Sequence, residues 1–369
     1  MISRNVFILK FSFLKMTTVI AVGDPHFRTD NIPEVEMFIE RLESLCLKHM
    51  PDLIVILGDV LHTHERLHTT PMNKAEELIH RMRKIAPTIV LVGNHDMISN
   101  QEFLTENHWM NAMKLWDNVT VVDRVISRQI NGLKFFFCPY VYAGRFQEAL
   151  NTCKEDWTKA DCIFAHQEFY GCKMAAIVSA EGDVWPDTYP LVVSGHIHGN
   201  QTLKNIYYCG SSMQHAFGES ERNIIPILTW KKGGKKYSLE EVDLDLPRKR
   251  IVYKDVSDME NFTLPETEDH LKITLSGDQE EFKAFKKTKK YKELVKTGTK
   301  VVFKPKKQRE NTESKHTERL GDDPTGDDPI DFHVILDTLI SAEKNPDLFE
   351  LYMMVVHGKE IKSEDILFV

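Results

Sequence analysis

Apolar runs separated by an amphipathic segment dominate the first hundred residues of the chain. Residues 17–22 and 52–57 are continuous apolar runs that predict two strands. Between them, after Pro33, apolar residues recur at helical spacing from Val35 to Cys46 and predict one amphipathic helix. Continuous apolar strands are usually covered on both faces, so this β-α-β unit favours a parallel sheet in an α/β fold.

The same alternation continues as far as Trp230. It predicts a helix over residues 73–85 and further strands at residues 88–92, 133–140, 161–167, 191–199, 206–211 and 224–230. From Leu133 onward the connections between the apolar runs become shorter. Together the two halves predict two packed sheets with outer helices, within one main domain over residues 17–245.

Composition changes after Leu246, and the pattern there predicts a small α/β capping unit over residues 246–304. Its expected elements are a strand at 270–277, a lysine-rich helix at 280–295 and a strand at 300–304. With 369 residues and 42% hydrophobic residues, the chain is long enough for two or three domains.

The two ends of the chain differ from these domains. Residues 305–329 are polar and contain the doubled turn-forming unit "GDDPTGDDP", which predicts a linker. Residues 330–369 contain two short amphipathic helical patterns, which we interpret as a partner-docking segment. Residues 1–16 form an N-terminal extension, with Met16 as an alternative start to Met1.

Charge is concentrated in one segment. Between Lys283 and Arg309 there are twelve lysine or arginine residues and a single acid, Glu293. The net charge of that segment is +11, so a whole-chain value of −8 leaves −19 for the remaining residues. A basic segment attached to an acidic body predicts an anionic partner for that segment.

The cysteines and the N-terminus indicate a reducing compartment. The six cysteines contain no CxxC pair, so we expect reduced thiols in a cytoplasmic or nuclear protein, without a disulfide framework or structural zinc. Lys10 and Lys15 interrupt the apolar N-terminus and no small-residue cleavage site follows, so we expect no secretory signal. No apolar run approaches the roughly 18 residues of a membrane-spanning helix, so we expect no membrane association.

Five apolar runs end in residues that commonly bind metals. In chain order these residues are Asp24 and His26, Asp59, Asn94 and His95, His166, and His196 with His198. Ligands bind outside the carboxyl ends of strands in open α/β sheets, so we expect these side chains to converge. Imidazole and carboxylate together suit Mn, Fe or Zn, and a bridging carboxylate lets two cations lie about 3.5–4 Å apart.

That pair of cations would suit the hydrolysis of a phosphate ester. The reaction needs a hydroxide, neutralisation of phosphate charge and a proton for the leaving alkoxide; metals supply the first two and a non-ligand histidine the third. Gly23, Gly58, Gly93 and Gly195 precede the candidate ligands and predict tight turns with close backbone approach. Any one histidine could be an ordinary core or surface residue, but that interpretation does not explain five ordered strand ends.

The motifs as a set resemble a known signature. "GDPH" (23–26), "GDVLH" (58–62), "GNHD" (93–96), the isolated His166 and "GHIHG" (195–199) resemble the ordered motifs of calcineurin-like metallophosphoesterases, over roughly residues 17–230. The resemblance implies a four-layer α-β-β-α sandwich with a dinuclear centre, followed here by the small α/β cap and the C-terminal helices.

Carried over by position, the resemblance assigns a role to each residue. One metal would be bound by Asp24, His26 and His198, the other by Asn94, His166 and His196, and Asp59 would bridge the two. His95, oriented by Asp96, would be the non-ligand histidine near the scissile phosphate. The implied cofactors are two divalent metal ions, most often Mn²⁺.

Two details resemble one branch of the family, the SbcD-type double-strand-break repair nucleases. The second motif ends in His62, which is implied to assist the catalytic histidine, and "YCGSSMQHAFGES" (208–220) matches the "GS" turn and "FGE" of that branch. In that branch a distal helical segment binds an SMC-like coiled-coil ATPase. The resemblance therefore implies a DNA exo/endonuclease of recombination or repair. A second copy of the chain is a further candidate partner, and the short cap makes a virus or phage a candidate source.

The lysine-rich helix is the candidate DNA-binding element outside the metal cluster. Lys286, Lys287, Lys289 and Lys290 lie beside aromatic residues at helical spacing, and lysines supply phosphate-backbone contacts. The same lysines could instead form a solvated surface, or bind RNA or an acidic protein. Two rival functions also stay open: hydrolysis of small phosphomonoesters or cyclic nucleotides, and a non-catalytic scaffold, although all seven proposed ligands are present.

Four further histidines fall outside the family pattern. They are His64, His68, His108 and His215. The family pattern does not require them. We therefore expect all four to be exposed loop residues, with a position at the mouth of the active site as the alternative.

Overall fold

The computed structural model describes residues 16–64, 66–174, 176–219, 222–231, 236–305, 340 and 346–357. The chain divides into two compact units, Met1–Lys307 and Gln308–Val369. In the second unit the structure describes α7 (Pro346–His357), which confirms the second predicted C-terminal helix. The first of those helices, the N-terminal extension before Met16 and the predicted linker beyond Pro305 lie outside the described residues.

The first large sheet is built on the predicted β-α-β units. Its strand order is β14-β13-β1-β2-β3-β4. Strands β1 to β4 are parallel to one another, β13 is antiparallel to β1, and β14 is antiparallel to β13. The bounds are β1 Thr17–Val22, β2 Leu53–Ile56, β3 Thr88–Leu91, β4 Val119–Val122, β13 Ile225–Trp230 and β14 Tyr237–Val242. The parallel strands therefore all end at the same edge of the sheet.

The second large sheet has the order β11-β12-β10-β7-β6-β5. Its four central strands are parallel, and the two edge strands, β5 and β11, are antiparallel to their neighbours. The bounds are β5 Ile126–Ile130, β6 Leu133–Cys138, β7 Cys162–His166, β10 Val192–Gly195, β11 Gln201–Leu203 and β12 Ile206–Tyr208. A separate two-stranded ribbon pairs β8 (Lys173–Met174) with β9 (Ile177–Val178).

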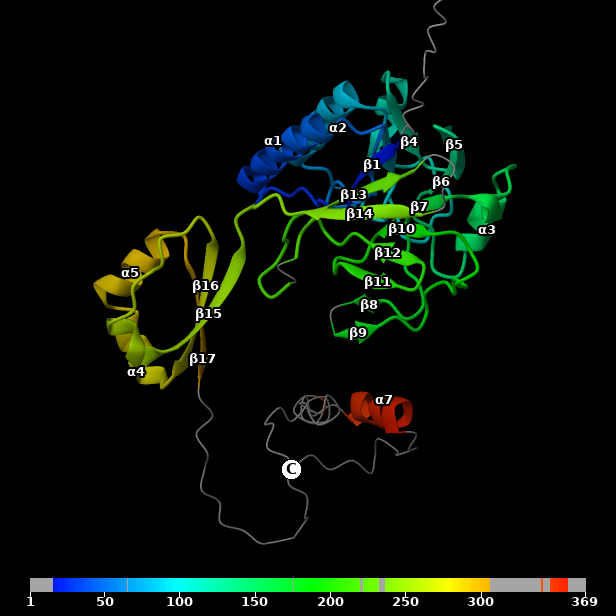
Figure 1. Ribbon diagram of the computed structural model, residues 1–369. Coiled ribbons are helices and arrows are strands. Elements are labelled where there is room, and N and C mark those ends of the chain that lie inside the picture. The colour runs from blue at the N-terminus through cyan, green and yellow to red at the C-terminus, as the bar shows by residue number, and fades with distance from the viewer. Residues whose placement is uncertain are drawn as a thin grey trace, which may run out of the picture. The chain divides into compact units, whose positions relative to one another are not determined.

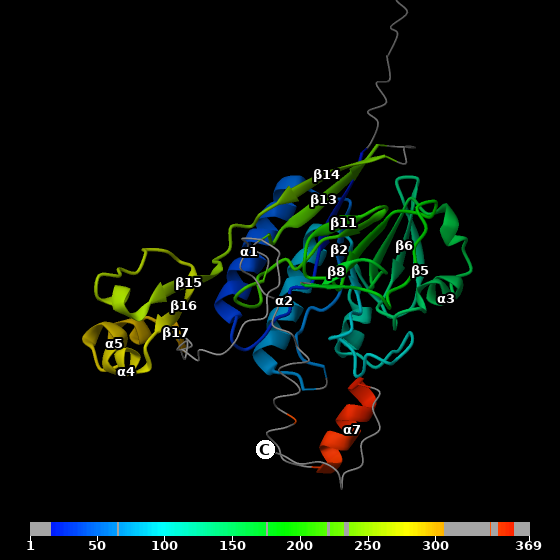
Figure 2. The same ribbon diagram turned by 90° about the horizontal axis from the view of Figure 1, so that it is seen from below.

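Alternate residues of each strand pack into different layers. Val55 of β2 faces Phe135 and Phe164 of the other sheet, whereas its neighbours Ile54 and Ile56 pack on the outer helices. These helices are α1 (Ile32–His49) and α2 (Thr69–Ile85), and α3 (Phe146–Asn151) covers the second sheet, as Figures 1 and 2 show. The predicted four-layer α-β-β-α sandwich is confirmed.

The small α/β unit has its own apolar core. Its parallel sheet, β15-β16-β17, is formed by Lys249–Asp255, His270–Gly277 and Lys300–Pro305, and α4 and α5 lie side by side on one face (Figure 1). The prediction of a single helix over 280–295 is wrong. Helix α4 (Gln279–Phe285) ends before α5 (Lys289–Lys296), because the Thr288 side chain accepts a hydrogen bond from the Tyr291 backbone and starts a new helix.

The other differences concern edges and ends. Sequence analysis missed β4, β5, β11, β14 and β15, which are all edge strands with partly exposed side chains and with polar residues that interrupt the apolar run. β10 ends at Gly195, so "HIHG" forms the loop that follows, and α2 begins four residues earlier than predicted. Short 3₁₀ helices occupy η1 (Trp109–Leu115), η2 (Trp157–Lys159) and η3 (Val256–Glu260). Among the described helices none is both long and apolar enough to cross a membrane.

Candidate metal centre

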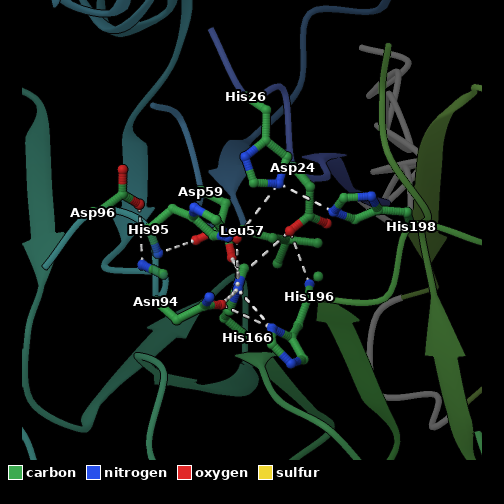
Figure 3. Close-up of polar contacts among 12 residues, drawn as sticks. Asp24, His26, Leu57, Asp59, Asn94, His95, Asp96, His166, His196 and His198 are labelled. Carbon is green, nitrogen blue, oxygen red and sulfur yellow. Dashed lines mark hydrogen bonds and ion pairs between the residues drawn. The ribbon is translucent and has the colours of Figure 1, made fainter. Parts of the chain in front are cut away.

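Side chains that follow five parallel strands meet in one cluster (Figure 3). Four groups have ligand atoms within 4.8 Å of one another: Asp24, His26 and Asp59; Asp59, His166 and His196; His26, His198 and His215; and His26, His62 and His95. The groups share members, so they form one continuous centre. The structure thus brings together the seven proposed ligands, with Asn94 joined to the cluster through His166 and His196.

Backbone turns aim these side chains inward. Four candidate ligands have left-handed backbone, with φ of 38° at Asp24, 43° at His26, 50° at Asp59 and 75° at His196. Such conformations cost of order 1–3 kcal/mol each for a residue other than glycine, and they persist at functional sites where the surroundings enforce them. Here the strand pairing before each turn provides that constraint.

Two glycines allow the turns that carry the candidate ligands to approach each other closely. A Cβ atom on Gly93 would overlap the Asp59 carboxylate, and one on Gly58, whose φ is +104°, would lie 2.8 Å from His166 Nδ1. The two turns after β2 and β3 can pack against each other only without side chains at these positions. The expected close backbone approach is present at both glycines.

One half of the cluster lies around His26. Its Nε2 atom is 3.0 Å from His198 Nε2 and 3.5 Å from Asp59 Oδ2. Asp24 is fully buried; its Oδ1 accepts a hydrogen bond from the His196 backbone, while its Oδ2 has no hydrogen-bond partner. Two imidazole nitrogens and an orphaned carboxylate oxygen facing one space form a donor set for a divalent cation.

The other half lies around His166. Its Nδ1 donates to the Leu57 carbonyl at 2.7 Å, which leaves Nε2 facing Asn94 Oδ1 at 3.0 Å and Asp59 Oδ2 at 3.4 Å. His196 Nδ1 lies 2.8 Å from the same Asn94 oxygen. Asp59 Oδ2 therefore lies between His26 and His166, where a bridging ligand must be.

The electrostatics of the buried carboxylates favour bound cations. Burial raises the pKa of Asp24 to about 6, because the charged form is desolvated. Burial also opposes ionisation of Asp59, yet His166 and His26 hold its pKa well below the usual range. Ionised carboxylates with almost no exposure require compensating charge, and the converging nitrogen and oxygen donors fit two divalent metal ions.

His95 lies beside the cluster without belonging to the two donor sets. Its backbone N–H donates to Asp59 Oδ1 at 2.8 Å, and its ring Nδ1 donates to the His62 carbonyl at 2.7 Å. The ring Nε2 is thus the atom that can exchange a proton with a bound substrate. Burial lowers the pKa of His95, so the free imidazole is neutral at pH 7, whereas the negative charge of a bound phosphate would favour the protonated ring that can donate from Nε2.

Asp96 stabilises the turn that carries His95. Its carboxylate accepts hydrogen bonds from the backbones of Gly93 and Leu61 and from Trp109 Nε1, and the described contacts of Asp96 do not include the His95 ring. The expected orientation of His95 by Asp96 is therefore indirect. The His62 carbonyl orients the ring, while Asp96 holds the turn that carries His95.

Three of the four additional histidines are not simple exposed loop residues. His215 is 5% exposed and its Nε2 donates to the Asp24 carbonyl at 2.9 Å, and the half-buried His64 stacks on His95 with ring centroids 4.5 Å apart. His108 contacts Asp123. Their loops fold back onto the sheet edge, which apolar periodicity does not reveal. His68 is exposed, as expected.

Glu219 was overlooked although it lies in the quoted "FGE" stretch. Its Oε2 accepts hydrogen bonds from the backbones of His215 and Ala216 at 2.8 and 2.9 Å, and its Oε1 lies 3.9 Å from His198 Nδ1. A carboxylate on that side of the imidazole directs the opposite nitrogen, Nε2, toward the cluster. The motif was the signal that could have identified it.

The four candidate DNA-binding lysines are outside the metal cluster, on the small α/β unit. Lys286 and Lys287 follow α4, and Lys289 and Lys290 open α5; the first three are exposed and Lys290 is half-buried. Lys286 Nζ lies 5.5 Å from the centre of the Phe282 ring.

Comparison with known proteins identifies the family. The model of the calcineurin-like phosphoesterase family matches residues 17–200. Protein 078R of invertebrate iridescent virus 3 is 46% identical over 295 residues, which cover 78% of this chain and 84% of that protein. Protein 244L of invertebrate iridescent virus 6 is 48% identical over 279 residues, which cover 73% of this chain and 98% of that protein. Both are named as predicted phosphoesterases.

Among solved structures, purple acid phosphatase PPD1 from yellow lupin seeds aligns with 62% of this chain and 52% of its own, at 12% identity and a TM-score of 0.39. The family match contains all seven proposed ligands, and both named relatives are viral, in agreement with the expected kind of source. The chain belongs to the calcineurin-like phosphoesterases, a family of hydrolases that use divalent metals.

Proposed function

We propose that the protein is a metal-dependent phosphodiesterase that cleaves DNA as an exo/endonuclease in recombination or double-strand-break repair. When bound, two divalent ions, Mn²⁺ in this proposal, supply a hydroxide and neutralise phosphate charge. His95 exchanges a proton with the substrate through Nε2, and the His62 carbonyl holds the ring in that orientation.

One observation favours a long polyanion over a small ester as the substrate. Lys286 and Lys287 are exposed on the turn between α4 and α5, and Lys289 is exposed at the start of α5, in a chain whose net charge is −8. Lysines grouped on an otherwise acidic chain are the electrostatic signature of binding to phosphate backbones. This observation carries the choice of nucleic acid.

A second candidate function is hydrolysis of small phosphomonoesters or cyclic nucleotides. A cavity of about 500 Å³ adjoins the cluster and is lined by Met174, His196, Ile197 and His198 among others. Its volume is in the range of pockets that hold small ligands. The cavity would accept a nucleoside-sized group of either substrate class, so the assay below includes both.

The direct test is Mn²⁺-dependent degradation of linear duplex and single-stranded DNA by the purified full-length chain. A chromogenic bis-phosphodiester and a phosphomonoester are measured alongside. Loss of DNA supports the nuclease, whereas turnover of the monoester with both DNA forms untouched at every ionic strength favours the second function. Two bound ions without turnover of any phosphoester would favour the non-catalytic scaffold.

Charge reversal at Lys286, Lys287, Lys289 and Lys290 should weaken DNA cleavage and leave hydrolysis of the chromogenic ester intact. Removing one lysine–phosphate ion pair should flatten the dependence of log affinity on log salt by up to about 0.9 for duplex DNA. The measurement is DNA affinity across a salt series, with charge reversal at the exposed Lys48 and Lys84 as the matched control. An unchanged slope would remove these lysines from the interface.

The partner proposal has a separate test. We propose that residues 330–369 bind an SMC-like coiled-coil ATPase, and that the chain acts as the nuclease subunit of such a complex. Removal of this segment should leave ester hydrolysis unchanged and abolish association with a candidate ATPase in a pull-down. Retained association would place the docking surface elsewhere. Whether the chain binds a second copy of itself is tested by measuring the mass of the purified protein in solution.

A further inference from the structure

A second cavity is lined by His62, which also belongs to the group of histidines around His26. Its volume is about 320 Å³, and its walls come from the loop after β1 and the loop between β2 and α2. His62 lines this cavity while its Nδ1 lies 3.4 Å from Nδ1 of the candidate ligand His26. A substrate bound at the metals therefore needs to extend only past one imidazole to enter the cavity.

Arg28 supplies a fixed cation in this cavity. Its side chain is only 22% exposed, and its Nη2 donates to the His215 carbonyl at 2.8 Å. Its Nε lies 3.1 Å from Oδ1 of Asp30, but that carboxylate is 72% exposed. Such a solvent-screened pair contributes little, so a phosphate, with more charge and several acceptor oxygens, can replace Asp30 at the guanidinium.

Helix α2 adds positive potential at the same place. His68, its N-cap residue, and Pro71 in its first turn both line the cavity. Among the described residues no side chain caps this end of the helix, and its first turn contains no acidic residue, in contrast to α1, which has Glu34 there. The N–H groups of Thr69 and Thr70 and the dipole of this 17-residue helix favour an anion beside its first turn.

We propose that this cavity is a subsite for the phosphate that neighbours the scissile phosphate in a nucleotide chain, with Arg28 as its principal ligand. The subsite rests on the proposed phosphodiesterase function and adds specificity to it. Polynucleotides, and short nucleotides that carry a second phosphate, would fill both sites. An ester with a single phosphate would fill only the metal site.

The test uses dinucleotides that differ in one terminal phosphate. Hydrolysis of the internal diester is measured for thymidine dinucleotides with a 5′-phosphate, with a 3′-phosphate and with neither, in the presence of Mn²⁺. We expect one phosphorylated form to be cleaved with about tenfold higher kcat/KM, mainly through a lower KM, as for one added charged hydrogen-bond pair. The form that gains identifies the direction in which the strand leaves the metals.

Variants are compared by the ratio of kcat/KM with and without the terminal phosphate, which is insensitive to general loss of activity. Arg28→Gln should bring the ratio close to one, Arg28→Lys should restore part of it, and Asp30→Asn should raise it by removing the competing carboxylate. Arg128→Gln, an exposed arginine on β5, is the matched control and should leave the ratio unchanged.

Failure of the subsite and failure of the enzyme have different outcomes. Equal cleavage of all three dinucleotides by the unaltered protein would overturn the subsite and leave the phosphodiesterase standing. A ratio that persists in Arg28→Gln would overturn the assignment of Arg28. No cleavage of any dinucleotide, with turnover of a phosphomonoester, would overturn both proposals.

Discussion

Replacing Asp59 with asparagine should remove both metal ions and lower phosphodiester hydrolysis by about a thousandfold, equivalent to about 4 kcal/mol of transition-state stabilisation. The asparagine keeps the size of the side chain and can still accept the hydrogen bond from the His95 backbone. What it loses is the charged oxygen that lies 3.5 Å from His26 Nε2 and 3.4 Å from His166 Nε2. Metal per chain after dialysis against Mn²⁺ is the direct measurement.

Asp52→Asn is the matched control for this experiment. Asp52 precedes the amino end of the same strand, β2, where its carboxylate accepts a hydrogen bond from the Thr18 backbone. Its substitution tests the stability of the sheet without touching the cluster. Two ions per chain retained in Asp59→Asn, with normal turnover, would show that the bridge lies elsewhere.

Replacing His95 with alanine should retain both metals and lower the rate of DNA cleavage by about 10²- to 10⁴-fold, the range expected when a proton donor is removed. The His95 backbone N–H, which alanine preserves, donates to Asp59 Oδ1, and the His95 ring belongs to neither of the two proposed sets of metal ligands. Esters with good leaving groups separate its two possible roles. A proton donor matters little when the leaving group is a nitrophenolate, whereas stabilisation of charge on phosphorus matters for every ester.

The measurement compares kcat for DNA and for the nitrophenyl ester in both proteins, together with metal content. His80→Ala, on helix α2 and beside Trp116, serves as a histidine control remote from the cluster. Unchanged DNA cleavage in His95→Ala would exclude the assigned role. Loss of metal in that variant would instead make His95 a structural part of the centre.

The sequence predicted the centre because its members follow apolar runs. Parallel strands end at a common edge, so the order of Asp24, Asp59, Asn94 and His166 along the chain was sufficient to predict their convergence. The four-layer sandwich was predicted from the same apolar runs, because a strand that is apolar along its whole length must be covered on both faces of its sheet.

The residues that sequence analysis misplaced or overlooked belong to irregular segments. His215 and Glu219 lie between β12 and β13, where no periodicity indicates that the loop folds back under Asp24. Arg28, which sequence analysis did not consider, lines its cavity two residues after His26, whose left-handed backbone no local pattern predicts for a histidine. The division of the lysine-rich helix likewise depends on one threonine side chain, Thr288.

The ligands come from both halves of the sandwich. Asp24, His26, Asp59 and Asn94 follow strands of one sheet, and His166, His196 and His198 follow strands of the other. Each ion would therefore be held by both sheets, and would cross-link them at the edge where the catalytic loops meet. Metal at a hundredfold excess over its dissociation constant stabilises the folded state by about 2.7 kcal/mol per site. The concentration of available metal would thus change the free energy of unfolding of the protein as well as its rate of turnover.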